Sequence, residues 1–297
     1  MFENIMVPLD GSLLAERALS PAANIAEAMQ AKLTLLRVVP QFALLAADPT
    51  LYEEMNRMGE DESLSYLRSK AGELDLAIQV EVAGESGQPA DVIIRYAETH
   101  GIDLIMMSSH GRSGLNRWIY GSVAERILRR APCTTAIINA RVAESSGEQK
   151  KILIPLDGSE LAERALKTGR MLAKAIDADL YLLRVTASAH QILETVSMKP
   201  VFEGIEEQEF REAEAYLQEK KSETPDFHTV IDVETEKGTV AENIVDYAAE
   251  HEIGMIVMSS HGRTGLKRWV YGSVAEKVLR SACCTTMIIR DQQSEPI

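Results

Sequence analysis

Residues 107–138 read MSSHGRSGLNRWIYGSVAERILRRAPCTTAII, and residues 258–289 read MSSHGRTGLKRWVYGSVAEKVLRSACCTTMII. At an offset of 151, the two stretches are identical at 24 of 32 positions. The starts of the halves also match, because residues 5–19 (IMVPLDGSLLAERAL) and 152–166 (ILIPLDGSELAERAL) share 12 of 15 residues. Each half falls within the usual domain size of roughly 100–200 residues. The sequence therefore predicts a tandem repeat of one domain, at residues 1–141 and 151–291, with a polar linker at 142–150 and a tail at 292–297.

The order of apolar runs and helical stretches predicts an α/β fold in each half. Residues 104–107 and 255–258 are apolar throughout, which is typical of strands buried on both faces of a parallel sheet. Strict alternation of strands and helices favours right-handed crossovers with helices on both faces. We therefore expect two Rossmann-like or flavodoxin-like domains, each with a five-stranded parallel sheet in the order 3-2-1-4-5. Ligands of such sheets bind beyond the carboxyl ends of the strands where the order reverses, and there the two repeated segments would meet.

The loop after the fourth strand has the composition of a phosphate-binding site. Each copy reads Ser-Ser-His-Gly, nine residues, then Gly-Ser, and the last pair (Gly121-Ser122, Gly272-Ser273) begins a helix. Glycine permits positive φ and a close approach of the backbone to a ligand. A helix start offers backbone N–H groups and the positive end of the helix dipole to an anion. An ordinary strand–helix turn has the same composition, and the P-loop sequence G-x-x-x-x-G-K-[ST] does not occur.

These residues resemble the universal stress proteins in their tandem two-domain form, over essentially the whole chain. The resemblance rests on Val-Pro-Leu-Asp-Gly-Ser (residues 7–12) and on the family signature Gly-x-x-Gly, nine residues, Gly-[Ser/Thr]. Both copies depart at the first glycine, which is replaced by Ser108 and Ser259. The resemblance implies adenine nucleotide alpha hydrolase-like domains, and ATP, ADP or AMP in each copy, with or without Mg²⁺.

The resemblance also implies which residues hold the nucleotide. Asp10 and Asp157 would hold its ribose or adenine side, Val38 and Val185 would meet the adenine, and the loop residues would hold the phosphates. In the first copy the implied site consists of Pro8, Leu9, Asp10, Val38, Ser108, His110, Gly111, Arg112, Gly121, Ser122 and Val123. In the second copy it consists of Pro155, Leu156, Asp157, Val185, Ser259, His261, Gly262, Arg263, Gly272, Ser273 and Val274.

Simpler interpretations compete for several of these residues. Asp10 and Asp157 precede a glycine and could be turn formers only. His110 and His261 have no acid or nucleophile beside them in the motif, which favours a structural role over acid–base chemistry. No catalytic residue is assigned. We expect an ATP-binding, nucleotide-gated regulator of the stress response; the alternatives are a slow ATPase and a nucleotide-free protein-interaction scaffold.

Charge and composition limit the partners and the compartment. The net charge of −14 argues against a nucleic-acid partner, and no apolar stretch of about 20 residues suggests a membrane span. The first residues lack the pattern of a signal peptide, and three cysteines do not make a disulfide framework, so we expect a cytoplasmic protein.

The last strand of each half is expected to be a pairing surface. CTTAII (residues 133–138) and CTTMII (284–289) are apolar and β-branched, and they would lie at a sheet edge that needs cover. We expect them to pair antiparallel as an intrachain pseudo-dimer, and whole chains could pair again as a homodimer.

Overall fold

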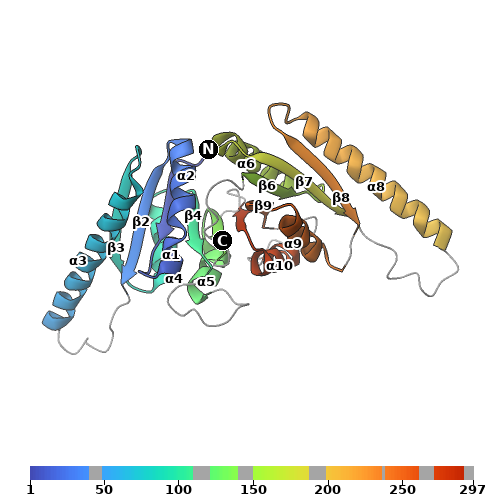
Figure 1. Ribbon diagram of the computed structural model, residues 1–297. Coiled ribbons are helices and arrows are strands. Elements are labelled where there is room, and N and C mark those ends of the chain that lie inside the picture. The colour runs from blue at the N-terminus through green and yellow to red at the C-terminus, as the bar shows by residue number, and fades with distance from the viewer. Residues whose placement is uncertain are drawn as a thin grey trace. The chain divides into compact units, whose positions relative to one another are not determined.

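The computed structural model describes residues 1–39, 49–109, 121–139, 150–186, 199–235, 238–260 and 271–290. The chain divides into two compact units: unit 1 is Met1–Ala143 with Arg290–Ile297, and unit 2 is Glu144–Ile289. Each unit contains five described strands alternating with helices (Figure 1).

Unit 1 has the predicted parallel sheet. Its neighbouring strands run in the order β3-β2-β1-β4-β5, and every pair is parallel. The order 3-2-1-4-5 is therefore confirmed. The elements are β1 (Asn4–Pro8), α1 (Leu13–Glu16), α2 (Leu19–Met29), β2 (Lys32–Val39), α3 (Pro49–Leu74), β3 (Val80–Ser86), α4 (Pro89–Thr99), β4 (Leu104–Ser108), α5 (Ser122–Arg130) and β5 (Thr134–Ile138).

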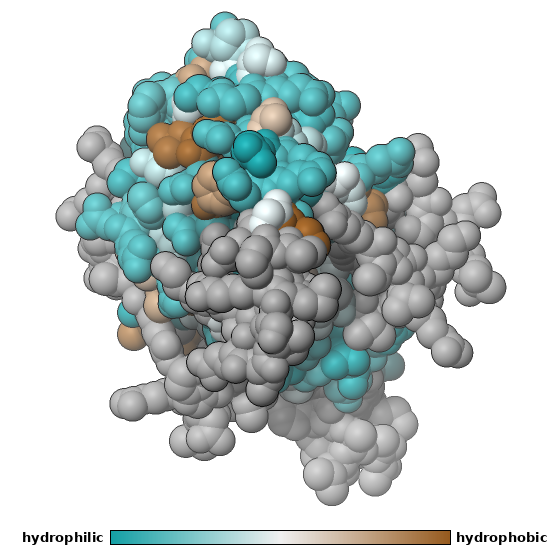
Figure 2. All heavy atoms as spheres, turned by 90° about the vertical axis from the view of Figure 1, so that its right-hand side faces the viewer, coloured by the Kyte–Doolittle hydropathy of each residue, from teal (hydrophilic) through white to brown (hydrophobic). Residues whose placement is uncertain are grey.

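Unit 2 repeats this arrangement. Its strand order is β8-β7-β6-β9-β10, again with every pair parallel. The elements are β6 (Lys151–Pro155), α6 (Glu160–Ile176), β7 (Asp179–Thr186), α8 (Lys199–Ser222), β8 (Thr229–Thr235), α9 (Val240–Glu250), β9 (Met255–Ser259), α10 (Ser273–Ser281) and β10 (Thr285–Ile289). The outward face of the molecule on the side of α8 is mainly hydrophilic, with small, separate hydrophobic patches (Figure 2).

The central strands carry the core of each unit. In β1 the side chains of Ile5, Met6 and Val7 are fully buried, and Leu104, Ile105 and Met106 of β4 are as deeply buried. The burial of consecutive residues shows that helices cover both faces of these strands. Strand order reverses between β1 and β4, which brings the segment after β1 beside the segment after β4.

The first helical segment differs between the units. In unit 1 the chain breaks between α1 and α2, whereas α6 is continuous. Pro21 accounts for the break, because a proline ring clashes with the carbonyl four residues earlier, here that of Arg17. The matching residue of unit 2 is Thr168, which a helix tolerates.

Candidate functional site

The turn after the first strand of each unit is built by aspartate and glycine. The backbone N–H of Ser12 donates to Asp10 Oδ1 at 2.9 Å, and in unit 2 the N–H of Ser159 donates to Asp157 Oδ1 at 3.0 Å. Gly11 has a φ of +83°, a conformation that favours glycine. Ser12 and Ser159 then cap α1 and α6 through their side chains. The turn-forming role of both aspartates is confirmed, and it leaves both carboxylates beside the carboxyl end of the central strand.

The glycines before α5 and α10 do not behave as predicted. Positive φ was one reason given for glycine there, but φ is −58° at Gly121 and −57° at Gly272, which any residue adopts. Their N–H groups were expected to face a ligand, but they donate to the carbonyls of Ser109 (3.2 Å) and Ser260 (2.9 Å). A Cβ on Gly121 would come no closer than 4.0 Å to its nearest neighbour, Ser109 O.

The first turns of α5 and α10 nevertheless keep the features of an anion site. No described side chain caps either helix start, whereas in unit 2 Ser159 caps α6 and Thr239 forms a capping box with Glu242 at α9. The first backbone N–H groups of a helix have no partner within the helix. At α5 and α10 these groups and the positive end of the helix dipole are therefore directed at the carboxyl edge of the sheet.

A cavity of about 540 Å³ lies at this edge in unit 1. Its volume is within the usual range of small-molecule sites, roughly 300–1,000 Å³. Eight predicted site residues line it: Pro8, Leu9, Asp10, Val38, Ser108, Gly121, Ser122 and Val123. The remaining three, His110, Gly111 and Arg112, lie outside the described residues. The two repeated segments thus contribute to one cavity.

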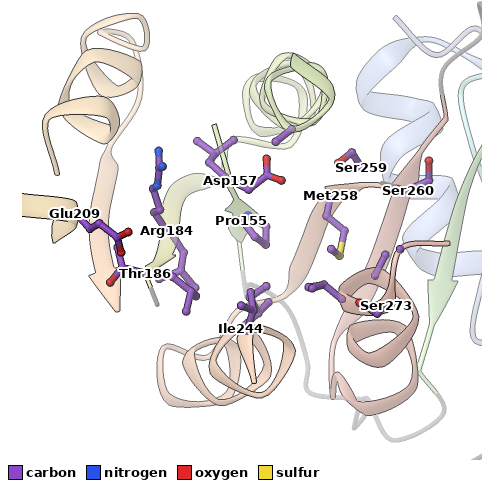
Figure 3. A pocket seen from close by; sticks show the side chains of 18 of the residues that line it. Pro155, Asp157, Arg184, Thr186, Glu209, Ile244, Met258, Ser259, Ser260 and Ser273 are labelled. Atoms are coloured by element: carbon purple, nitrogen blue, oxygen red, sulfur yellow. The ribbon is translucent and has the colours of Figure 1, made fainter. Parts of the chain in front are cut away.

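Unit 2 has the matching cavity, of about 520 Å³. Its lining includes Pro155, Leu156, Asp157, Val185, Ser259, Gly272, Ser273 and Val274, whereas His261, Gly262 and Arg263 lie outside the described residues. Ser259, Ser260 and Ser273 gather at one end of the cavity, and Arg184, Thr186 and Glu209 lie at the other, with Asp157 between them (Figure 3). The cavity therefore has a serine-rich end at β9 and α10 and a charged end at β7 and α8.

Sequence reasoning missed a group of four side chains behind the cavity of unit 1. Arg37, on β2, lines the cavity, and its guanidinium carbon lies 4.8 Å from the centre of the Tyr66 ring. The Tyr66 hydroxyl donates to Glu16 Oε1 at 2.8 Å, and Lys70 Nζ lies 3.1 Å from Glu16 Oε2. We call these four residues the Arg–Tyr–Glu–Lys network. It joins α1, β2 and α3.

Unit 2 builds the same network from matching residues. The Arg184 guanidinium carbon lies 5.0 Å from the centre of the Tyr216 ring. The Tyr216 hydroxyl donates to Glu163 at 3.3 Å, and Lys220 Nζ lies 3.2 Å from the same carboxylate. Burial, followed by the Glu163 charge, raises the pKa of Tyr216 to about 12, and burial together with Glu16 raises the pKa of Tyr66 as well. Both tyrosines are therefore neutral donors at physiological pH.

Within the described residues, no group of three or more His, Cys, Asp and Glu side chains is arranged to hold a metal ion. None of the described helices has the length and apolar character that a membrane span requires.

Comparison with known proteins gives consistent matches to one family. The family model described as the universal stress protein family matches residues 1–139 and again 148–290. Universal stress protein MJ0531 of Methanocaldococcus jannaschii is 30% identical over 159 residues, which are 54% of this chain and 92% of that protein. Universal stress protein YxiE of Bacillus subtilis is 28% identical over 147 residues, 46% of this chain and 99% of that protein.

The solved structures extend the likeness to the whole chain. A universal stress protein from Archaeoglobus fulgidus has a TM-score of 0.70 and 21% identity, covering 97% of this chain and 98% of that one, which shows the shared fold. A universal stress protein solved in complex with cAMP is 24% identical and covers 47% of this chain and 98% of that one, with a TM-score of 0.35.

Proposed function

This chain belongs to the universal stress protein family, and from that premise we propose that each unit binds one adenine nucleotide in its cavity. The observation that carries the proposal is the pair of matching cavities, about 540 Å³ and 520 Å³, each lined by the start of a helix that no described side chain caps. We propose that the bound nucleotide, ATP, ADP or AMP, sets the regulatory state of the protein in the stress response.

The residues of each cavity fit the parts of a nucleotide. The phosphates would lie at the first turn of α5 or α10, where backbone N–H groups and the Ser122 or Ser273 hydroxyl can donate to them. Asp10 or Asp157 would accept from the ribose hydroxyls, because an ionised carboxylate is a strong acceptor. The backbone at Val38 or Val185 would meet the base. A Mg²⁺ ion, where present, would neutralise phosphate charge and arrive with the nucleotide.

A binding role fits the described lining better than rapid catalysis. General acid–base chemistry uses a group with a pKa near the working pH, most often histidine. Neither cavity has a histidine among its described lining residues. We therefore propose a regulator rather than an enzyme. Measured ATP turnover would favour the slow-ATPase alternative, and failure to bind nucleotide would favour the scaffold.

We also propose that the units pair through their last strands. β5 ends the strand order of unit 1, and β10 ends that of unit 2. An apolar sheet edge invites pairing unless something covers it. The same surface, or another face of the pair, could then bring two chains together as a homodimer.

Added charge at the helix starts provides the test of nucleotide binding. Ser122→Glu and Ser273→Glu place a carboxylate where phosphates are proposed to lie, and an acidic residue in a first helical turn does not disfavour the helix. Both serines are exposed. Isothermal titration of nucleotide-free protein with ATP should show two sites in the parent, one in each variant and none in the double variant. Ser65→Glu, at an exposed position of α3 away from the cavity, is the control and should keep both sites. Binding by the double variant would place the site elsewhere, and no binding by the parent would refute the proposal.

A further inference from the structure

The two cavities differ at the end formed by the second strand and the long helix of each unit. Helices α3 and α8 align at an offset of 150, because this offset matches Tyr66 with Tyr216 and the fully buried Leu67 with Leu217. The same offset matches Glu62 with Glu212, and both of these line their cavities. It matches Gly59 with Glu209, so one cavity has a glycine where the other has a carboxylate.

In unit 1 this end of the cavity is close-packed at Gly59 and has one carboxylate fewer than in unit 2. A Cβ on Gly59 would lie 3.2 Å from Val39 Cγ1, so the glycine allows α3 to approach the end of β2. The Ser63 hydroxyl, which also lines the cavity, donates to the Gly59 carbonyl at 2.7 Å. Glu62 lies 3.8 Å from Arg37 and is largely exposed. The described wall at this end contains the aliphatic side chains of Val38 and Val39 together with Arg37, Glu62 and Ser63.

In unit 2 the same end is rich in hydrogen-bond acceptors. Thr186 replaces Val39, and its hydroxyl donates to the Glu234 carbonyl at 3.3 Å, which leaves its oxygen to accept. Glu209 and Glu212 lie three residues apart on α8 and therefore on one face of the helix. Figure 3 shows Glu209 beside Thr186 at the end of the cavity opposite Ser273. The described lining of unit 2 has three carboxylates with Arg184, whereas that of unit 1 has two with Arg37.

We infer that the two cavities select different base edges, and that unit 2 requires a hydrogen-bond donor, such as an exocyclic amine, where unit 1 does not. This inference rests on the proposed nucleotide binding. With the phosphates at α10 and the ribose at Asp157, the base lies at the β7 and α8 end. There a base carbonyl would face the additional Glu209 carboxylate, which cannot donate to it, whereas the Arg184 guanidinium at this end has its counterpart in Arg37 of unit 1. A carboxylate accepts from an amine but offers no donor to a carbonyl, so Glu209 favours a base that carries an amine at this point.

ATP and ITP provide the probes, because they differ along one edge of the base: ATP has an amino group at position 6 and an acceptor at N1, whereas ITP has a carbonyl at position 6 and an N–H at N1. Ser122→Glu leaves unit 2 as the binding unit, and Ser273→Glu leaves unit 1. Titration of each variant with both nucleotides gives a ratio of dissociation constants for each unit. The preference for ATP over ITP should be about tenfold greater in unit 2 than in unit 1, or about 1.4 kcal/mol.

Substitution of Glu209 ties the difference to this residue. Glu209→Gln in the Ser122→Glu background supplies an amide that can donate to a carbonyl, so the preference of unit 2 should fall to that of unit 1. Glu214→Gln removes the same charge from an exposed position of α8 that does not line the cavity, and it should leave the preference unchanged. Gly59→Glu with Val39→Thr, in the Ser273→Glu background, should raise the preference of unit 1, with circular dichroism to verify the fold.

The outcomes separate this inference from the proposal on which it rests. Equal preferences in the two units, or a preference that Glu209→Gln does not change, would overturn the inference and leave nucleotide binding intact. If neither single-site variant nor the parent binds ATP, both are overturned.

Discussion

Tyr66→Phe removes one hydroxyl from the Arg–Tyr–Glu–Lys network of unit 1 and keeps the aromatic ring. The hydroxyl donates to Glu16 at 2.8 Å. The Glu16 side chain is 18% exposed, so its carboxylate is largely shielded from water. A hydrogen bond to a charged group contributes about 1.5–3 kcal/mol to stability. Lys70 still pairs with Glu16 in the variant, so we expect a loss at the lower end, about 1.5 kcal/mol in the free energy of unfolding.

Tyr216→Phe is the matched variant in unit 2 and should cost less. The corresponding hydrogen bond is longer, 3.3 Å, and the Glu163 side chain is 40% exposed. Water competes for such a carboxylate, so we expect a loss of about 0.5 kcal/mol, at the low end for an ordinary hydrogen bond. Both variants keep the ring on which Arg37 or Arg184 packs, so neither should disturb the lining of its cavity.

Differential scanning calorimetry can measure both changes. For a unit of this size, about 1 kcal/mol shifts Tm by roughly 2–4 °C. The transition of unit 1 should therefore fall by about 3–6 °C in Tyr66→Phe, and that of unit 2 by about 1–2 °C in Tyr216→Phe. Equal shifts in the two units, or a shift in unit 1 smaller than that in unit 2, would refute the argument from distance and burial.

Three further predictions concern the cysteines and the last strands. Burial raises the pKa of Cys133 and Cys284 to about 12, so iodoacetamide at pH 8 should alkylate exposed Cys283 alone in the native protein; modification of all three would contradict this. The same raised pKa values make the free energy of unfolding depend on pH. Below about pH 9 the thiols are protonated in both states; above it the unfolded thiols ionise while the folded ones keep their protons, so the free energy of unfolding should fall towards pH 12. A flat profile in urea titrations over this range would speak against it. Ile137→Lys or Ile288→Lys should separate the units or cause aggregation; rapid hydrogen exchange along β5 and β10 in the parent protein would disprove their pairing.

The features that the sequence could predict are those with a local or periodic signal. Uninterrupted apolar runs identified β4 and β9, and alternation with helices predicted parallel sheets. The Asp-Gly-Ser turn was predictable because glycine supports the positive φ of Gly11 and serine caps the next helix. Pro21 carried a local signal for the break between α1 and α2, which the helical periodicity around it obscured.

The features that the sequence did not predict depend on tertiary contacts. Gly121 was singled out because glycine permits a positive φ and a close approach of a ligand, but its φ is ordinary and its N–H donates to the Ser109 carbonyl, a contact that depends on how β4 leaves the sheet. The Arg–Tyr–Glu–Lys network joins Glu16 to Tyr66 across 50 residues. Its signal was the spacing Tyr-Leu-x-x-Lys, present at residues 66–70 and 216–220 in the least similar part of the two halves.

Because this network recurs in both units, the two cavities can differ in their lining while the surrounding helices and strand keep the same arrangement. In both units the network fixes the long helix against the second strand and the first helix. A residue one or two turns before the tyrosine then meets the cavity at the same point in each unit. Gly59 and Glu209 occupy that point, and Val39 and Thr186 face it. The helix start that is proposed to hold phosphates is alike in both units, so we expect substitutions at this wall to change the base preference and to leave the proposed nucleotide binding itself intact. In this way a duplicated domain can hold two sites that bind a ligand in the same manner but prefer different bases.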